Sequence, residues 1–284
     1  MWIGDEPLDL GLTLVDSAQC FRWVRAGERY GCVLNGQPVW LRRGADGLHA
    51  EGACDRALLR SYLDLDRDYA AVAAEYAHIP AARRAIELFP GLRVLNQPAW
   101  EALVCFILSA NNNVGRIRSL TAALSARYGA RHDTAHGTLY GFPAPERLAQ
   151  ASEDALRDLR VGYRAPYMIG TARRVVEGFP LDALQGMPYD EAHARLVTLP
   201  GVGDKVADCV LLFGCGHASA FPVDIWVARL LRDWFGLDGC SRAALGRQAR
   251  ARLGGHAGLM QQFLFHAART GAIALGETGV PENA

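Results

Sequence analysis

The pattern of hydrophobic and polar positions divides the chain into a strand-like N-terminal part and a longer part with helical periodicity. Within residues 10–52, short runs rich in β-branched and aromatic residues are separated by the turn signals Asn35-Gly36 and Asp46-Gly47. The predicted strands cover residues 19–24, 30–34 and 38–42. Closely spaced strands joined by short turns favour an antiparallel sheet.

From about residue 54 the hydrophobic period becomes helical. Residues 100–109 are apolar on nearly every side, which predicts a buried helix. Residues 129–145 lack a clear period and are expected to form a loop. Further helices are predicted at residues 114–128, 163–178, 190–197, 224–235 and 259–275. The strands are therefore expected in the N-terminal part of the sequence and the helices in the part that follows.

Composition argues against several classes of protein. The 284 residues are 50% hydrophobic with a formal net charge of zero, so bulk charge does not indicate a nucleic-acid partner. No apolar run reaches the ~18 residues of a membrane span, and residues 1–6 lack a secretion signal. Seven scattered cysteines without a CxxC pair argue against zinc, an iron–sulfur cluster or a disulfide framework. These features favour a cytoplasmic protein.

The most informative stretch is residues 199–210, in which Gly201-Val-Gly203 leads into an apolar helical run. Two glycines one residue apart allow a tight turn whose amides run into a helix N-terminus, a favourable place for phosphate. Lys205 follows this turn and is the only lysine of the sequence. Lysine can lose a proton and form a Schiff base, which arginine does not easily do. The pattern therefore predicts a nucleophilic lysine beside a phosphate-binding turn.

Spacing groups further side chains around this lysine. Lys205 and Cys209 are four residues apart and share one helix face, as do Gln261 and Phe265. If the two faces meet, they form a pocket able to sandwich a flat heterocycle and bind its edge. Asp224 follows the stiff segment Phe-Pro-Val, which would fix its carboxylate.

Each of these residues also has a plainer interpretation. Asp224 suits a helix N-cap, while Cys209 and Phe265 suit a hydrophobic core. Gln261 is compatible with a partly exposed polar position, and the turn with an ordinary helix–turn–helix connection. Lys205 fits the plain interpretation least, because a merely solvated cation would be arginine in so arginine-rich a chain. The joint occurrence of these residues favours a reactive site.

Several motifs accompany the hairpin. They are Gln19-Cys-Phe-Arg-Trp23, Ser109-Ala-Asn-Asn-Asn113-Val-Gly-Arg116-Ile, Gly162-Tyr-Arg164-Ala-Pro-Tyr and Gln261-Gln-Phe-Leu-Phe265, with Phe-Pro-Val-Asp224 placed nineteen residues after Lys205. Together they resemble the 8-oxoguanine DNA glycosylase/AP lyase family of the helix-hairpin-helix DNA glycosylase superfamily. The resemblance runs from about residue 8 to residue 270.

The resemblance implies an α+β fold with an N-terminal antiparallel sheet domain, including closing helices, over residues 1–80. Two mostly helical domains would follow over residues 81–284, with the helix-hairpin-helix at about residues 190–215 and the active-site cleft between these two domains.

The resemblance also implies roles around the lysine. Lys205 would attack the sugar C1′ and form a Schiff base. Asp224 would assist deprotonation and stabilise cationic character on the sugar. Cys209 and Phe265 would sandwich the flipped base, with Gln261 on its Watson–Crick edge.

Contacts with the duplex are implied as well. Asn111 would occupy the gap left by the flipped base, and Asn112 is expected to bind DNA beside it. Tyr163 would wedge at the kink. Arg116 and Arg164 would read the orphaned cytosine.

The hairpin would contribute backbone groups. Amides near Gly201 and Gly203 would grip a phosphate. The carbonyls of Val197, Leu199 and Val202 would hold a monovalent or similar cation.

Two positions depart from the family pattern. Ala18 stands where the family typically has glycine, whose carbonyl accepts the extra N7 hydrogen of the oxidised base. Alanine keeps this carbonyl, but a positive φ would be strained here. Trp226 replaces a histidine that some members use near the lesion phosphate, so that contact is not expected.

The sequence therefore predicts a monomeric bifunctional enzyme that removes 8-oxoguanine opposite cytosine from duplex DNA and then cleaves the strand. No cofactor beyond the structural cation and no membrane partner are expected, and a bacterial protein would associate with the nucleoid.

Three alternatives stay open. A glycosylase for alkylated bases normally lacks the lysine. A glycosylase for oxidised pyrimidines usually ends in a four-cysteine cluster, and no cysteine follows Cys240. A non-catalytic DNA-binding module needs neither Lys205 nor the pair of Gln261 and Phe265.

Overall fold

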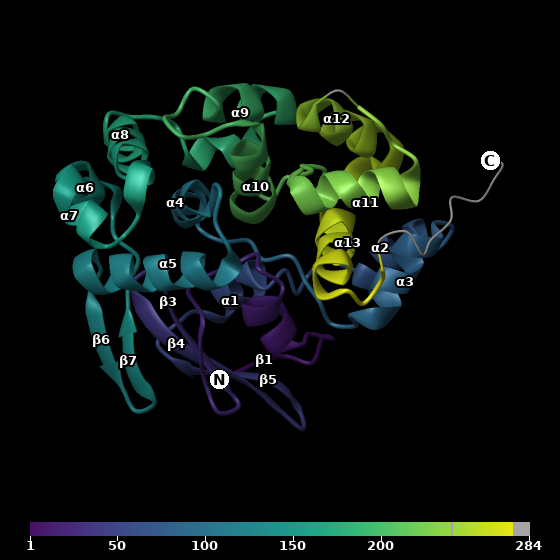
Figure 1. Ribbon diagram of the computed structural model, residues 1–284. Helices are drawn as coiled ribbons and strands as arrows, with labels where there is room; N and C mark the ends of the chain where they lie inside the picture. The colour runs from purple at the N-terminus through teal and green to yellow at the C-terminus, as the bar shows by residue number, and fades with distance from the viewer. Residues whose placement is uncertain (240, 275–284) are drawn as a thin grey trace.

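The N-terminal part forms the predicted antiparallel sheet. The structure, a computed structural model, describes residues 1–239 and 241–274, so Cys240 and the end of the predicted domain 81–284 lie outside the described residues. Five strands pair in the order β1-β5-β4-β3-β2 (Figure 1). They are β1 (Trp2–Gly4), β2 (Val24–Ala26), β3 (Arg29–Leu34), β4 (Gln37–Gly44) and β5 (Gly47–Gly52). Asn35 and Gly36 both have positive φ, as the tight β3–β4 turn requires.

The strand predicted at residues 19–24 is wrong except for its last residue, where β2 begins. The preceding side chains are anchored outside the sheet. The amide of Gln19 bonds the backbone of Arg93 and Leu95, and the Trp23 indole donates to the hydroxyl of Tyr62 at 3.0 Å. Apolar composition alone does not reveal these distant partners.

The loop predicted at residues 129–145 is also wrong, because it contains a two-stranded hairpin, β6 (Arg131–Thr134) and β7 (Gly137–Tyr140). The hairpin packs against the larger sheet. Trp40 donates to Thr134 at 2.9 Å, and Leu139 joins a small buried cluster with Trp40 and Val33. Only Leu139 of its strands is buried, so the sequence shows little hydrophobic alternation there.

Helices make up most of the remaining chain, which confirms the α+β prediction (Figure 1). They are α1 (Arg56–Tyr62), α2 (Tyr69–Glu75), α3 (Pro80–Leu88), α4 (Ala99–Ser109), α5 (Val114–Tyr128), α6 (Pro145–Ala149), α7 (Glu153–Asp158), α8 (Ala165–Val176), α9 (Tyr189–Leu196), α10 (Asp204–Gly214), α11 (Ile225–Phe235), α12 (Arg242–Leu253) and α13 (Ala257–Thr270). None of the helices among the described residues is long and apolar enough to cross a membrane.

Helix α4 is the central buried helix, as predicted. It packs closely against α10, where a Cβ on Gly214 would lie 3.0 Å from Ala99 and Ala102. Phe106 stacks on Phe213 with ring centroids 5.3 Å apart. This packing brings Ser109, the last residue of α4, to the beginning of α10.

Buried ionic contacts join the sheet to the helices. Arg22 forms an ion pair with Glu101 of α4 and donates to the carbonyls of Val33 and Tyr140. Both charged side chains are at least 96% buried, so removing one would leave the other uncompensated. The pair therefore holds β3, β7 and α4 together.

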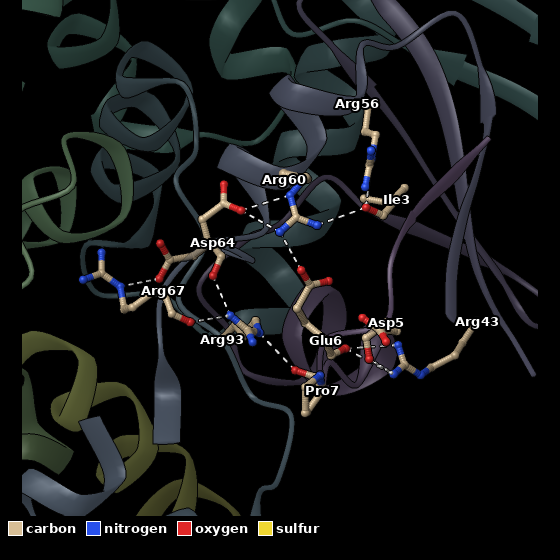
Figure 2. Close-up of polar contacts among 11 residues, drawn as sticks. Ile3, Asp5, Glu6, Pro7, Arg43, Arg56, Arg60, Asp64, Arg67 and Arg93 are labelled. Carbon is tan, nitrogen blue, oxygen red and sulfur yellow. Dashed lines mark hydrogen bonds and ion pairs between the residues drawn. The ribbon is translucent and has the colours of Figure 1, made fainter. Parts of the chain in front are cut away.

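A second polar network fixes the N-terminal segment (Figure 2). Arg60 bonds Glu6 at 2.5 Å and the carbonyl of Ile3 at 3.0 Å. The buried guanidinium of Arg93 donates to the carbonyls of Pro7 at 3.0 Å and Asp64 at 2.5 Å. These bonds anchor residues 3–7, the segment that precedes Ala18 in the chain.

Candidate active site

The hairpin between α9 and α10 is held by α8. Thr171 donates to the carbonyl of Pro200 at 2.8 Å. Gly201 has φ +77°, and a Cβ there would lie 2.7 Å from the Cβ of Tyr167. Glycine is therefore required at 201 for conformation and for space. Gly203 is the N-cap of α10 and has open space around it.

Lys205 lies in the first turn of α10 and is half-buried. Its Nζ donates to the hydroxyl of Ser109 at 3.1 Å and lies 5.0 Å from the ring centroid of Phe106. The Ser109 hydroxyl itself donates to the carbonyl of Phe106 at 2.7 Å. The amine is therefore held between a hydroxyl oxygen and an aromatic face.

Cys209 lies one turn further along α10, as its spacing predicts, and is 2% exposed. Burial raises the pKa of its thiol to about 11, against the opposing effect of the Lys205 charge. The thiol is thus neutral at pH 7 and is not a nucleophile. Lys205 is left as the candidate for that role.

Asp224 is the N-cap of α11. Its Oδ1 accepts the amides of Trp226 at 2.9 Å and Val227 at 2.8 Å. The capping interpretation is therefore confirmed. A carboxylate fixed at the positive end of a helix is also a well-oriented negative charge, so capping does not remove Asp224 from a catalytic role.

Lys205 and Asp224 line one pocket of about 700 Å³. Four other predicted residues line it as well: Ala18, Asn111, Asn112 and Phe265. Sequence reasoning assigned no role to several of the remaining lining residues: Phe21, Phe106, Ser109, Arg242 and Arg269. Trp226 also lines the pocket, although no phosphate contact was expected of it. The Ser-Ala-Asn-Asn-Asn motif was a signal for Ser109, because this serine lies two residues before the first asparagine.

Gln261 lies on α13 and is buried rather than partly exposed. Its amide nitrogen donates to the carbonyl of Pro222 at 3.2 Å, two residues before Asp224. Its Oε1 is buried without a hydrogen-bond partner among the described residues. A buried unpaired acceptor is costly in a folded protein, which favours a ligand that would supply the missing donor.

Ala18 adopts the predicted strained conformation, with φ +61°. Alanine rarely occupies this region, because its Cβ approaches the following carbonyl oxygen. Ala18 lines the pocket, and its two neighbours in the chain, Ser17 and Gln19, are both fully buried.

The asparagine segment forms an exposed loop at the pocket rim. Asn111 has φ +49°, and its amide donates to the Tyr163 hydroxyl at 3.3 Å. Tyr163 is 51% exposed, as a wedge would have to be. Arg164 is instead buried and donates to the carbonyls of Ala110, Asn111 and Val161. In this structure Arg164 therefore supports the loop, and base reading by Arg164 stays a prediction.

Two other predicted DNA contacts have intramolecular partners. Asn112 donates to the carbonyl of Leu108 at 3.0 Å. The exposed Arg116 donates to the carbonyl of Arg160 at 3.3 Å. Both acceptors are backbone oxygens. The bond of Asn112 is partly buried, whereas that of Arg116 is exposed, and DNA binding by both residues stays a prediction.

The predicted cation would be held by hairpin carbonyls, and the described residues contain no metal-binding cluster of acidic, histidine or cysteine side chains. The Leu199 carbonyl accepts the Val202 amide at 3.2 Å, and Val197 lies exposed just after α9. One carbonyl thus already has a partner, and cation binding stays a prediction.

Family comparisons agree with this geometry. Residues 104–253 match the model of the HhH-GPD superfamily base excision DNA repair protein. Residues 2–103 match the N-terminal domain of 8-oxoguanine DNA glycosylase.

Individual relatives carry related names. An N-glycosylase/DNA lyase of Saccharomyces cerevisiae is 36% identical over 54% of this chain, and the match spans only 45% of the yeast protein. An Arabidopsis thaliana N-glycosylase/DNA lyase is 31% identical, over 91% of this chain and 76% of the relative.

A solved structure extends the similarity to three dimensions. It shows the Clostridium acetobutylicum 8-oxoguanine glycosylase/lyase with double-stranded DNA containing cytosine opposite 8-oxoguanine. It is 28% identical with a TM-score of 0.88, and the match covers 94% of both chains. The chain described here belongs to the HhH-GPD superfamily of base excision DNA repair proteins, in the group that carries the N-terminal domain of 8-oxoguanine DNA glycosylase.

Proposed function

We propose that this protein is a base excision repair DNA glycosylase with AP lyase activity, which removes 8-oxoguanine opposite cytosine from duplex DNA. One observation carries the proposal: the sole lysine lies in a pocket bordered by a helix-capping aspartate and aromatic rings, within a glycosylase fold. The Clostridium relative, which was solved with 8-oxoguanine opposite cytosine, supports the choice of lesion.

The chemistry requires an extrahelical base, because C1′ is unreachable inside a duplex. The lone pair of Lys205 Nζ forms a bond to C1′ as the bond from C1′ to the base breaks, and the base leaves with that electron pair and takes up a proton. The adduct then opens the sugar ring to a Schiff base. Loss of a C2′ proton expels the 3′ phosphate oxygen, which nicks the strand.

Asp224 supports the first step electrostatically. Its Oδ1 is anchored by two backbone amides, so its position needs no reorganisation as positive charge develops on the sugar. It would also assist deprotonation of the attacking amine.

The base would lie between Cys209 and Phe265. The neutral thiol suits contact with a ring face. Gln261 offers an unpaired Oε1 to a donor on the Watson–Crick edge, and oxidised and normal guanine both carry such donors. Discrimination between the two bases must therefore come from another residue, and we assign this role to Ala18, which lines the pocket.

The remaining contacts would position the duplex as a substrate for one monomer. Asn111 would fill the gap, with Asn112 binding DNA beside it and Tyr163 as the wedge at the kink. Arg116 and Arg164 would read the cytosine after releasing backbone carbonyls. The amides near Gly201 and Gly203 would bind a phosphate, with the cation at 197–202 as a structural aid rather than a reagent. The proposed location is the cytoplasm, with association to the nucleoid in a bacterium.

Cleavage of duplexes with 8-oxoguanine opposite each of the four bases, with and without borohydride, tests the proposal. We expect nicking and a trapped covalent complex, both most efficient opposite cytosine. A duplex with 3-methyladenine and one with an oxidised pyrimidine serve as comparison substrates. Preferential action on either, or DNA binding without any cleavage or trapping, would refute the proposal.

A further inference from the structure

The structure shows how the strained residue in the pocket wall is held. The φ of +61° at Ala18 lies in a region that alanine populates roughly tenfold less than its ordinary conformations. Such a conformation persists only where the surroundings over-determine it, and it clusters at functional sites.

The peptide carbonyls on both sides of Ala18 each accept a hydrogen bond from a buried glutamine. Gln262 of α13 donates to the carbonyl of Ser17 at 2.7 Å. Gln97, just before α4, donates to the carbonyl of Gln19 at 2.7 Å. The two donors are 1% and 4% exposed, so water does not compete for these bonds.

The side chains next to Ala18 are fixed as well. The Gln19 amide donates to the carbonyls of Thr13 and Arg93 and to the Ser17 hydroxyl, and its Oε1 accepts the Leu95 amide at 2.8 Å. Ser17 in turn donates to Thr13 at 3.0 Å. Residues 17 and 19 therefore have little freedom to let residue 18 relax.

The carbonyl of Ala18 differs from those of its two neighbours in its hydrogen bonding. Within residues 1–239 and 241–274, no hydrogen bond is donated to its carbonyl, although both neighbouring carbonyls have partners. Ala18 lines the pocket, whereas Gln97 and Gln262 do not. The carbonyl of Ala18 is thus left as an acceptor for a ligand. The two glutamines hold Ala18 only through the carbonyls of its neighbours, Ser17 and Gln19.

We infer that Gln262 and Gln97 are positioning residues for base discrimination, which hold the left-handed conformation of Ala18 so that its carbonyl accepts the N7–H of an oxidised purine. The inference rests on the proposed function. Guanine has an N7 lone pair in place of this hydrogen, so a fixed carbonyl rejects it, while a mobile carbonyl would turn away and tolerate it.

The test replaces Gln262 with methionine, which keeps the length of the side chain but removes the donor. The readout is the ratio of affinities for duplexes with 8-oxoguanine opposite cytosine and with guanine opposite cytosine. We expect Gln262→Met to lower this ratio roughly tenfold, the factor by which alanine disfavours the left-handed region. AP lyase activity on a preformed abasic duplex should not change, because no base is read there.

Gln248→Met is the matched control. Gln248 is exposed on α12 and does not line the pocket, and its amide donates to the carbonyl of Asp238. It should keep the wild-type ratio.

A double-mutant cycle with Ala18→Gly separates positioning from general loosening. Glycine enters the left-handed region about as readily as the right-handed one, so it needs the glutamine less. In the Ala18→Gly background, Gln262→Met should lower the ratio only about twofold. Equal losses in both backgrounds would overturn the inference, because the glutamine would then not act through residue 18.

Gln97→Met provides an independent variant if Gln262→Met fails to keep its AP lyase activity. It should lower the ratio by a similar factor, and an unchanged ratio would overturn the inference while the wild-type enzyme still excises 8-oxoguanine. A wild-type enzyme that does not distinguish the two duplexes would instead refute the proposed function itself.

Discussion

Asp224 combines an observed structural role, the N-cap of α11, with a proposed chemical one. It caps α11 through a single oxygen, Oδ1, and this bond fixes the direction of the carboxylate toward the pocket shared with Lys205. The structure confirms the capping interpretation and places Asp224 in the lining of the pocket, where the proposed chemical role needs it. Charge and capping are separable, because asparagine caps a helix about as well as aspartate.

We expect Asp224→Asn to keep the stability of the protein within about 0.5 kcal/mol and to lower single-turnover excision by at least 100-fold, since only the charge is lost. Thermal denaturation and excision kinetics measure the two effects. Asp68 is the matched control, because its Oδ1 caps α2 through two amides at 2.9 and 3.0 Å. Asp68→Ala should cost about 1 kcal/mol with normal excision. Full activity of Asp224→Asn would limit Asp224 to capping.

His266 gives the protein an acid-sensitive contribution to stability. The centroid of its ring lies 4.5 Å from that of the Phe89 ring. Its Nδ1 lies 3.2 Å from a guanidinium nitrogen of Arg269, which donates to it. Burial, and secondly the Arg269 charge, lower its pKa to about 4. In the unfolded chain histidine titrates near 6.5. The unfolded state therefore binds a proton first as pH falls.

It follows that His266 stabilises the fold above pH 6.5 and that this contribution falls progressively between about pH 6.5 and 4, by at most about 3 kcal/mol. Urea unfolding of the wild type and of His266→Phe across this range measures the effect. The free-energy difference between the two proteins should shift against the wild type as the pH falls. A difference that is independent of pH would show that His266 titrates normally in the fold.

At the scale of elements, the hairpin depends on the conformation of one glycine and hardly on the other. Gly201 has a positive φ and lies against Tyr167, while Gly203 has φ −99° and open space. Both offer only backbone amides to a phosphate. Substituting each glycine in turn therefore distinguishes an effect of hairpin geometry from an effect of removing any glycine.

Gly201→Ala should destabilise the protein by about 1–2 kcal/mol or more and weaken binding to undamaged duplex at least tenfold, because strain and a clash with Tyr167 displace the amides. Gly203→Ala keeps its amide and should have small effects on both. Chemical denaturation and DNA titration at fixed salt compare the variants. Equal tolerance of the two substitutions would argue that the hairpin does not grip phosphate.

Local spacing predicted the helices that carry the candidate site residues. Lys205 and Cys209 share α10, and Gln261 and Phe265 share α13, because a four-residue interval defines a helix face. The β6–β7 hairpin escaped prediction, since its pairing depends on contacts with Trp40 almost one hundred residues earlier. Periodicity in the sequence identifies the buried face of a helix or strand, but not the distant segment that packs against it.

At the scale of the whole molecule, the site depends on contacts between distant segments. The bond from Lys205 to Ser109 spans 96 residues, and that from Gln262 to Ser17 spans 245. No local pattern predicts such pairs. The fold class, the lysine and the aspartate were therefore accessible from sequence, whereas the support of Ala18 and the partner of the amine required the structure.

Segments from several parts of the chain meet around the proposed nucleophile. The N-terminal segment supplies Ala18, α4 supplies Ser109, α10 supplies Lys205 and α13 supplies Phe265 to a single pocket. The central claim is that Lys205 performs the covalent step there. Because the chain has no other lysine, the α-amine is the only competing primary amine, and the adduct can be located without ambiguity.

Borohydride trapping on 8-oxoguanine duplex, followed by proteolysis and mass spectrometry, tests this claim most directly. We expect one adduct, on Lys205, and no trapping or nicking by Lys205→Gln or by Lys205→Arg, whose guanidinium stays protonated. Both variants should still bind the lesion duplex, since stacking and phosphate contacts lie elsewhere. An adduct on Met1, or full activity of Lys205→Arg, would contradict the account.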